Sequence, residues 1–131
     1  MKTVMAFGTF DIFHPGHESF LKQAKKYGKL IVIIARDKTV KQVKGKLPKR
    51  NEKQRQRAVR ASGIADKVIL GSITDKYAAI KKYQPDFIAL GYDQQYFVDQ
   101  LKKQKFKAKI IRLKPFLSHK YKTSLLKNAK K

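Results

Sequence analysis

A single α/β domain with a doubly wound, five-stranded parallel sheet is the fold that the sequence predicts. Short apolar runs of strand length recur along the chain and alternate with segments of helical period. The connections between successive runs are long enough to hold a helix, as parallel strands require. At 131 residues the chain can bury a substantial core, and we expect one domain over residues 1–131.

The first strand and the first helix enclose a glycine-rich turn. Residues 3–7 form an apolar run of strand length, and residues 8–17 (GTFDIFHPGH) lead into a segment of helical period. Pro15 suits the first turn of that helix, where its missing N–H costs nothing, and Gly28 is a natural helix stop. Residues 30–35 are a continuous apolar run, typical of a central strand that is buried on both faces.

The rest of the chain repeats this alternation. Asn51 and Thr74 have side chains that cap helix N-termini, and Pro85 ends the helix before it. The remaining predicted elements are a helical turn over residues 39–43 within a long basic connection, a helix over 52–61, a strand over 67–71, a helix over 74–83, a strand over 87–90, a helix over 96–104, a strand over 108–113 and a last helix that begins near Thr123.

The charge of the chain is its most unusual compositional feature. It has 32 Lys and Arg against 9 Asp and Glu, which gives a formal net charge of +23. Ten basic residues and one acidic residue lie between Lys38 and Arg60, and twelve basic residues but no acidic one follow Asp99. Such a field attracts polyanions. It is compatible with a nucleoside triphosphate, a nucleic acid or an anionic membrane surface, and also with a merely solvated surface.

Other compositional features narrow the class of protein. No apolar run approaches the roughly 20 residues that a transmembrane helix needs. The N-terminus runs directly into the first strand and leaves no room for a signal peptide. The absence of cysteine fits a cytoplasmic protein. We therefore expect a cytoplasmic protein with no membrane partner.

The turn between the first strand and the first helix has the features of a phosphate site. Free backbone donors at a helix start, together with the positive end of the helix dipole, favour an anion. His14 and His17 lie on either side of the helix start, so both imidazoles can donate to an α-phosphate as charge develops there. A pair of capping or core histidines is the alternative. His119 is the third and last histidine, so ligands are scarce and no metal ligand is assigned.

Residues in the turn and in the basic connection are further candidates. Asp11 has three candidate roles, namely orienting a histidine, holding a divalent cation and capping the turn. Lys44 and Lys46 flank Gly45 and can close over phosphates, or can belong to a solvated surface. Arg55 is one of several arginines between residues 50 and 60, so its position alone does not distinguish it.

Two later segments fall at the carboxyl edge of the predicted sheet, where open α/β sheets bind ligands. Gly91 lets a base or ribose approach the backbone, and Asp93 can accept from hydroxyl groups, although a plain β-turn uses the same residues. Lys122, Thr123 and Ser124 form a second helix start suited to β- and γ-phosphates, with an ordinary N-cap as the alternative.

Together these motifs resemble those of the cytidylyltransferase-like nucleotidyltransferases over almost the whole chain. The most specific motif is GTFD followed by the HxGH signature, within residues 8–17. The weaker ones are Ala35-Arg36-Asp37, Lys44-Gly45-Lys46, an arginine in the next helix, Gly91-Tyr92-Asp93-Gln94 and the Thr123-Ser124 helix start. The resemblance implies a Rossmann-like doubly wound sheet. It also implies an enzyme that transfers a nucleoside monophosphate from a triphosphate to a phosphate monoester and releases pyrophosphate.

The resemblance also implies roles for individual residues. His14 and His17 would contact the nucleotide phosphates and stabilise the transition state, while Lys46 and Arg55 would neutralise phosphate charge. The residues expected to bind the nucleotide are Thr9, Phe10, His14, Pro15, Gly16, His17, Gly91, Asp93, Lys122, Thr123 and Ser124. Asp11 and Lys44 are assigned to the acceptor. Mg²⁺ is the expected divalent cation, and a homodimer is possible.

The resemblance favours one substrate pair over another. The HPGH turn, Ala-Arg-Asp, Gly45 and the LGYDQ loop look closer to archaeal-type FAD synthases, which adenylylate FMN with ATP. Many glycerol-phosphate cytidylyltransferases carry RTEGISTT before the last helix, where residues 117–124 here read LSHKYKTS and lack the arginine. Lys120 or Lys122 in its place would supply a point charge without a bidentate fork.

We therefore expect FMN adenylylation. The alternative is CTP-dependent transfer to glycerol 3-phosphate or a similar small phosphate. A nucleic-acid-binding module on the same fold, suggested by the charge, is a further alternative that the intact phosphate turn disfavours.

Overall fold

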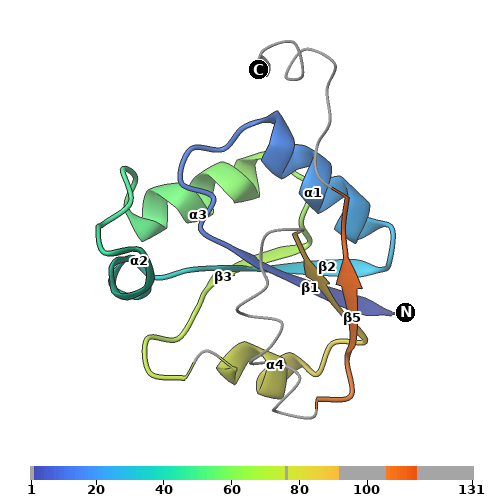
Figure 1. Cartoon of the computed structure of the whole chain (residues 1–131). Coiled ribbons are helices and arrows are strands. Elements are labelled where there is room, and N and C mark those ends of the chain that lie inside the picture. Colours follow the sequence, from blue (N-terminus) through green and yellow to red (C-terminus); the bar gives the residue numbers. More distant parts are fainter. Residues whose placement is uncertain (1, 76, 92–105, 115–131) are drawn as a thin grey trace.

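Five parallel strands form the centre of the protein, in the order β3-β2-β1-β4-β5. The computed structural model (Figure 1) describes residues 2–75, 77–91 and 106–114. Its elements are β1 (Thr3–Gly8), α1 (Pro15–Lys25), β2 (Lys29–Ile34), α2 (Asp37–Lys44), α3 (Glu52–Ala61), β3 (Lys67–Leu70), α4 (Ala78–Tyr83), β4 (Phe87–Leu90) and β5 (Lys109–Arg112). The helices predicted over 96–104 and near Thr123 lie outside the described residues, as do Asp93, Lys122, Thr123 and Ser124.

The sheet has a switch point beside its first strand. From β1 the chain adds β2 and then β3 on one side, whereas β4 and β5 lie on the other side. β1 therefore pairs with both β2 and β4, for example at Ala6, which lies between Val32 and Ala89. This confirms the predicted Rossmann-like, doubly wound, five-stranded parallel sheet. The turn after β1 and the loop after β4 meet where such sheets bind ligands.

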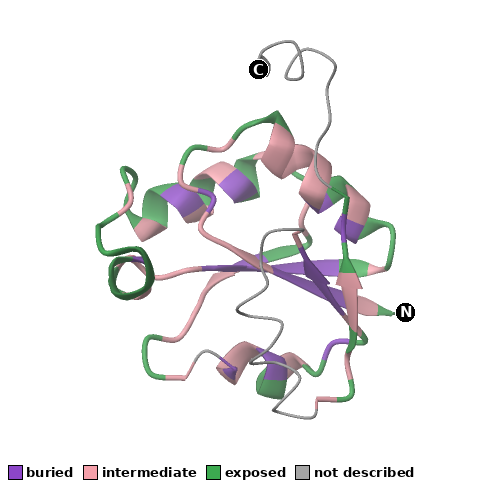
Figure 2. Ribbon diagram, in the orientation of Figure 1, coloured by how far each residue is buried: buried purple, intermediate pink, exposed green. Residues whose placement is uncertain are grey.

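Helices cover both faces of the sheet (Figure 1), and buried residues form one core on each side. Alternate residues of β1 supply the two cores, because successive side chains of a strand point to opposite faces. Val4 and Ala6 belong to the core beneath α1 and α3, and Met5 belongs to the core beneath α4. Figure 2 shows the burial concentrated in the strands and in the inner sides of these helices.

Two helices differ from the prediction. α2 is longer than the helical turn expected over residues 39–43. It ends at Lys44, and Gly45, which has a φ of 85°, is its C-cap. The helix expected from Thr74 instead begins at Ala78. The Ser72 hydroxyl accepts from the N–H groups of Thr74 and Asp75, so these polar side chains form a turn in place of a helix cap.

No helix within the described parts of the chain combines the length and the apolar character needed to cross a membrane.

Candidate active site

The buried ring of Phe10 packs beneath the turn after β1, against Gly8 and His17. Phe10 has a positive φ of 51° and only 4% of its surface is exposed. Its ring lies 5.1 Å from that of His17 between centroids and folds back over Gly8, where a Cβ would lie 2.6 Å from the ring. Any side chain at Gly8 would therefore displace Phe10. The structure thus places the Phe10 side chain in the core, where it supports His17 and the phosphate turn.

The two histidines form a reciprocal capping box at the start of α1. His14 Nδ1 accepts from the Gly16 N–H at 3.0 Å, and His17 Nδ1 accepts from the His14 N–H at 3.3 Å. Their rings stack with centroids 3.7 Å apart and an interplanar angle of 22°. The alternative interpretation of the pair, as capping histidines, is therefore correct for the Nδ1 atoms.

This capping arrangement sets the direction of the remaining donors. A neutral imidazole has one N–H and one acceptor nitrogen, so acceptance at Nδ1 assigns the proton to Nε2 in both rings. Burial and, secondarily, the charge of His14 lower the pKa of His17 to about 4, which keeps this ring neutral at physiological pH. Two stacked rings with Nε2–H donors are thus fixed at the switch point of the sheet.

The expectation of free backbone donors at this helix start is wrong. Pro15 has no N–H, and the Gly16 N–H is bonded to His14 Nδ1. The N–H groups of His17 and Glu18 both bond to the carbonyl oxygen of His14, at 2.9 and 3.1 Å. The capping box therefore uses the first-turn donors, and the imidazole Nε2–H groups replace them as the anion donors of α1.

The lowered pKa of His17 predicts a specific pH dependence of stability. The pKa lies near 6.5 in the unfolded chain and near 4 in the folded one, so the unfolded chain binds more protons between these values. The contribution of His17 to stability is therefore complete above pH 6.5 and is lost as the pH falls towards 4. Urea denaturation over this range should show the decline, and a His17→Gln variant should show a smaller one.

Two carboxylates with lowered pKa values, Asp66 and Asp75, titrate in a lower window and do not obscure this decline. Hydrogen bonds from Lys25 and from the Tyr77 N–H lower the pKa values of Asp66 and Asp75, respectively. Their contributions therefore disappear only below about pH 4. If the free energy of unfolding fell equally with pH in wild type and in His17→Gln between pH 6.5 and 4, the neutral, half-buried state of His17 would be contradicted.

Asp11 joins the phosphate turn to the basic connection. Its carboxylate accepts from the N–H groups of Lys49 and Arg50, at 2.9 and 2.8 Å. Burial alone would raise the pKa of Asp11, but these two hydrogen bonds and the charges of Arg55 and Lys49 lower it overall. Of the three roles considered from the sequence, the structure shows the cap.

Arg55 is a buried clamp between three segments. It is 1% exposed, and its guanidinium donates to the carbonyl oxygens of Thr9 and Arg50, at 2.8 and 3.0 Å. A third bond, at 2.7 Å, pairs it with the Asp37 carboxylate. The resemblance implied a phosphate-neutralising group, whereas the structure directs these donors to the protein itself. We therefore assign Arg55 as a positioning residue that fixes the turn from behind.

Asp37 and Glu52 connect the starts of α2 and α3. Sequence reasoning included Asp37 only as a member of the Ala35-Arg36-Asp37 motif and gave neither residue a role. The Asp37 N–H donates to Glu52 at 2.8 Å, and the Glu52 N–H donates to Asp37 at 3.2 Å. Arg36 Nε also donates to Glu52, at 2.9 Å. One feature of the sequence could have indicated the role of Glu52: it is the one acidic residue between Lys38 and Arg60.

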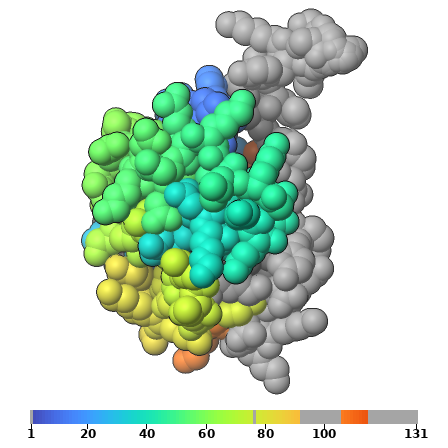
Figure 3. Space-filling view, turned by 90° about the vertical axis from the view of Figure 1, so that its left-hand side faces the viewer, coloured from blue at the N-terminus to red at the C-terminus, as the bar shows by residue number. Residues whose placement is uncertain are grey.

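A strongly positive face adjoins the turn. Figure 3 shows α2, α3 and the connection between them on one side of the molecule. Nine basic residues of this segment are exposed, namely Lys38, Lys41, Lys44, Lys46, Lys49, Arg50, Lys53, Arg57 and Arg60. The acids Asp11, Asp37 and Glu52 are engaged in the bonds described above. The face is therefore suited to attracting a triphosphate towards the turn.

The remaining predicted residues are placed as follows. Lys44 is the last residue of α2, and Lys46 follows Gly45. Both side chains are exposed, and no bond among the described residues fixes either of them over the histidines. Gly91 follows β4, and its carbonyl oxygen accepts from Arg112 at 2.7 Å. Within residues 2–75, 77–91 and 106–114, no three His, Cys, Asp or Glu side chains come together as a metal-binding group.

Comparisons with known proteins agree with this geometry. Residues 5–129 match the family model described as Cytidylyltransferase-like. FAD synthase from Ferroglobus placidus is 48% identical over 119 residues, which span 87% of this chain and 77% of that protein. FAD synthase from Methanohalophilus mahii is 45% identical over 119 residues, which span 86% of this chain and 82% of that protein.

Solved structures show the same fold. The crystal structure of a lipopolysaccharide core biosynthesis protein from Thermoplasma volcanium GSS1 has a TM-score of 0.79 and 36% identity, and the match covers 89% of this chain and 99% of that one. Pantoate-beta-alanine ligase from Francisella tularensis has a TM-score of 0.61 and 19% identity, and the match covers 89% of this chain and 60% of that one. At 19% identity the second likeness concerns the fold alone.

Proposed function

Because the chain belongs to the cytidylyltransferase-like family, we propose that this nucleotidyltransferase is an FMN adenylyltransferase, which transfers AMP from ATP to FMN and releases pyrophosphate. The FAD synthase relatives, which are 41–48% identical, support ATP and FMN as the substrate pair. The same turn can serve CTP and a small phosphate such as glycerol 3-phosphate, which is the alternative.

The stacked histidine pair is the observation that carries this function. An oxygen of the FMN phosphate attacks the α-phosphorus of ATP, and the bond from that phosphorus to the pyrophosphate oxygen breaks. Negative charge increases on the oxygens around the α-phosphorus during this displacement. The Nε2–H donors of His14 and His17, whose directions are fixed by their capping bonds, are suited to stabilising that charge without rearrangement.

Other residues support the proposal through position and charge. Arg55 fixes the backbone of Thr9, and Asp11 fixes the connection that begins α3, so the turn is pre-organised. Lys44 and Lys46 are exposed beside this connection, and we propose that they approach the triphosphate when it binds. Asp93, Lys122, Thr123 and Ser124 keep their proposed roles in nucleotide binding.

Magnesium is the proposed divalent cation. Mg²⁺ is usually held by substrate phosphates, water and one or two carboxylates. The Asp11 carboxylate in the phosphate turn already accepts two backbone hydrogen bonds. We therefore propose that ATP, rather than the protein, supplies most of the ligands of this ion. When bound, the ion would neutralise charge on the triphosphate.

A pyrophosphate-release assay tests the function directly. ATP, CTP, GTP and UTP are each combined with FMN, glycerol 3-phosphate, phosphocholine, phosphoethanolamine or phosphopantetheine. We expect release with ATP and FMN and formation of FAD by chromatography. Release only with CTP and a small phosphate would replace this proposal with the cytidylyltransferase alternative. No release from any pair, together with salt-sensitive binding of DNA or RNA, would favour a nucleic-acid-binding module.

A further inference from the structure

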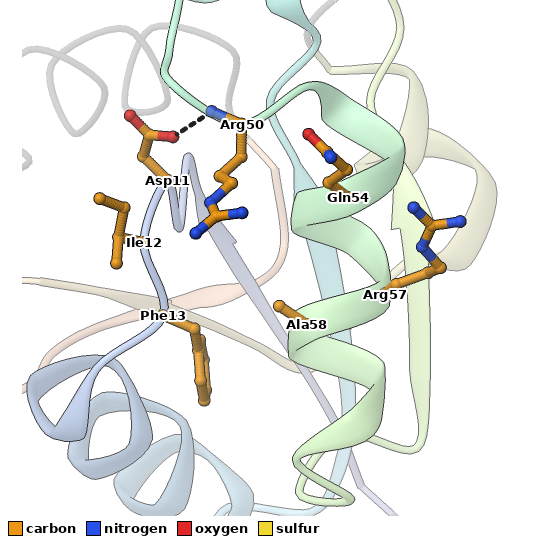
Figure 4. Close-up of a pocket in the computed structure, with 7 residues that line it drawn as sticks. All are labelled: Asp11, Ile12, Phe13, Arg50, Gln54, Arg57 and Ala58. Carbon is orange, nitrogen blue, oxygen red and sulfur yellow. Dashed lines mark hydrogen bonds between the residues drawn. The ribbon is translucent and has the colours of Figure 1, made fainter.

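A pocket of about 280 Å³ lies between the phosphate turn and α3. We call it the Arg50 pocket, and it is lined by Asp11, Ile12, Phe13, Arg50, Gln54, Arg57 and Ala58. Figure 4 shows the Arg50 side chain and the Phe13 ring reaching into the space that Ala58 faces, while Arg57 points away from it. The pocket thus combines an apolar wall with one inward-directed guanidinium.

The backbone of Arg50, and not its side chain, makes the bonds that hold this part of the fold. Its N–H donates to Asp11, and its carbonyl oxygen accepts from Arg55. The Asp11 carboxylate is directed to the N–H groups of Lys49 and Arg50. The guanidinium of Arg50 is therefore presented to the pocket by a fixed backbone. A guanidinium is flat and stacks on aromatic rings.

Phe13 connects the Arg50 pocket to the histidine pair. Phe13 precedes His14 in the chain, and its ring lies 5.6 Å from that of His17 between centroids. A ligand that packs against Phe13 in the pocket therefore lies one ring away from the His17 imidazole. A volume of about 280 Å³ is near the lower limit of small-molecule sites, which suits one ring system better than a whole dinucleotide.

We propose that the Arg50 pocket binds the isoalloxazine ring of the acceptor FMN. This inference rests on the proposed function and adds to it the site that selects the acceptor. The ring packs its apolar faces against Phe13 and Ala58 and stacks on the Arg50 guanidinium. Its ribityl chain then extends towards His14 and His17, where its phosphate attacks ATP.

Two variants of the pocket and one control test this proposal. Arg50→Ala removes the stacking group but keeps both backbone bonds, and Ala58→Leu fills the pocket from α3. We expect each to raise the KM for FMN about tenfold, since the loss of one stacking contact or of the space for the ring is of that order. The KM for ATP should change less than twofold. Lys22→Ala, which removes an exposed charge from α1 and neither lines the pocket nor belongs to the positive face, should leave both values unchanged.

Riboflavin provides a second readout, because it has the ring but no phosphate. It should inhibit the wild-type enzyme competitively against FMN, and this inhibition should weaken in Arg50→Ala and Ala58→Leu. Arg50→Lys keeps the charge but loses the flat surface, so it should resemble Arg50→Ala. Recovery of the wild-type KM in Arg50→Lys would overturn the stacking role.

The outcomes separate this inference from the proposed function. A wild-type enzyme that forms no FAD would refute the proposed function itself. An active wild type whose pocket variants keep the wild-type KM for FMN would refute the pocket alone. An equal rise of the KM values for ATP and FMN would also overturn the assignment, because it would show a general disturbance of the turn. Circular dichroism of each variant checks that it is folded.

Discussion

Replacing His17 with alanine is expected to lower kcat for FAD formation by about 10²–10³, the usual loss when one pre-organised donor is removed from an oxyanion-type site. The variant loses the Nε2–H donor and also the acceptor for the His14 N–H. His14 then has no ring stacked against it, so its own position is less well fixed. Stopped assays with saturating ATP and FMN measure the change.

The fold is expected to survive this substitution. Losing a helix cap costs about 1 kcal/mol, and the core beneath α1 depends on Leu21 and Ala24. Glu18→Ala is a matched control, because it removes a favourable charge from the same helix turn at a cost of about 0.3–1 kcal/mol and takes away no proposed donor. An unchanged kcat in His17→Ala, or an equal loss in Glu18→Ala, would refute the assigned role of His17.

Local sequence signals predicted the elements whose ends carry a clear stop or cap. The predicted bounds of α3 match the structure, because Asn51 accepts from the Gln54 N–H and is a true N-cap. β4 also matches, since its apolar run is bounded by Pro85 and Gly91. In contrast, Thr74 has the side chain of a cap but lies in a turn organised by Ser72. The choice between two adjacent capping residues depends on packing that the sequence does not display.

The candidate site was predicted in part for a similar reason. His14 and His17 were found because their spacing across a helix start is a local pattern. The clamp by Arg55 is not local, since it joins Thr9 and Asp37 from distant positions in the chain. The direction of the histidine donors also required the structure, because only the capping bonds at Nδ1 assign the protons to Nε2.

Substituting Arg55 with methionine is expected to reduce both stability and turnover. The change removes a guanidinium that is fully buried and leaves the carbonyl oxygens of Thr9 and Arg50 without this donor. Losing one partner of a buried, hydrogen-bonded charge pair typically costs about 3–5 kcal/mol. We expect the lower part of this range, because the Asp37 side chain is 28% exposed and stays partly solvated. Urea denaturation of the variant measures the loss.

If Arg55 positions the turn, the variant should also lose turnover beyond the amount that unfolding alone explains. At low temperature, where the folded fraction can be determined by circular dichroism, kcat per folded molecule should still fall at least tenfold, because the turn at Thr9 is released. Asp37→Asn is the comparison variant: its amide oxygen can still accept from Arg55, although the bond from the Glu52 N–H and the carboxylate charge are lost, so kcat should fall less than in Arg55→Met. Arg55→Lys should not restore activity, because one ammonium group cannot reach three acceptors arranged around a planar guanidinium. If folded Arg55→Met had the wild-type kcat, Arg55 would contribute to stability only, and the turn would hold the two histidines without it.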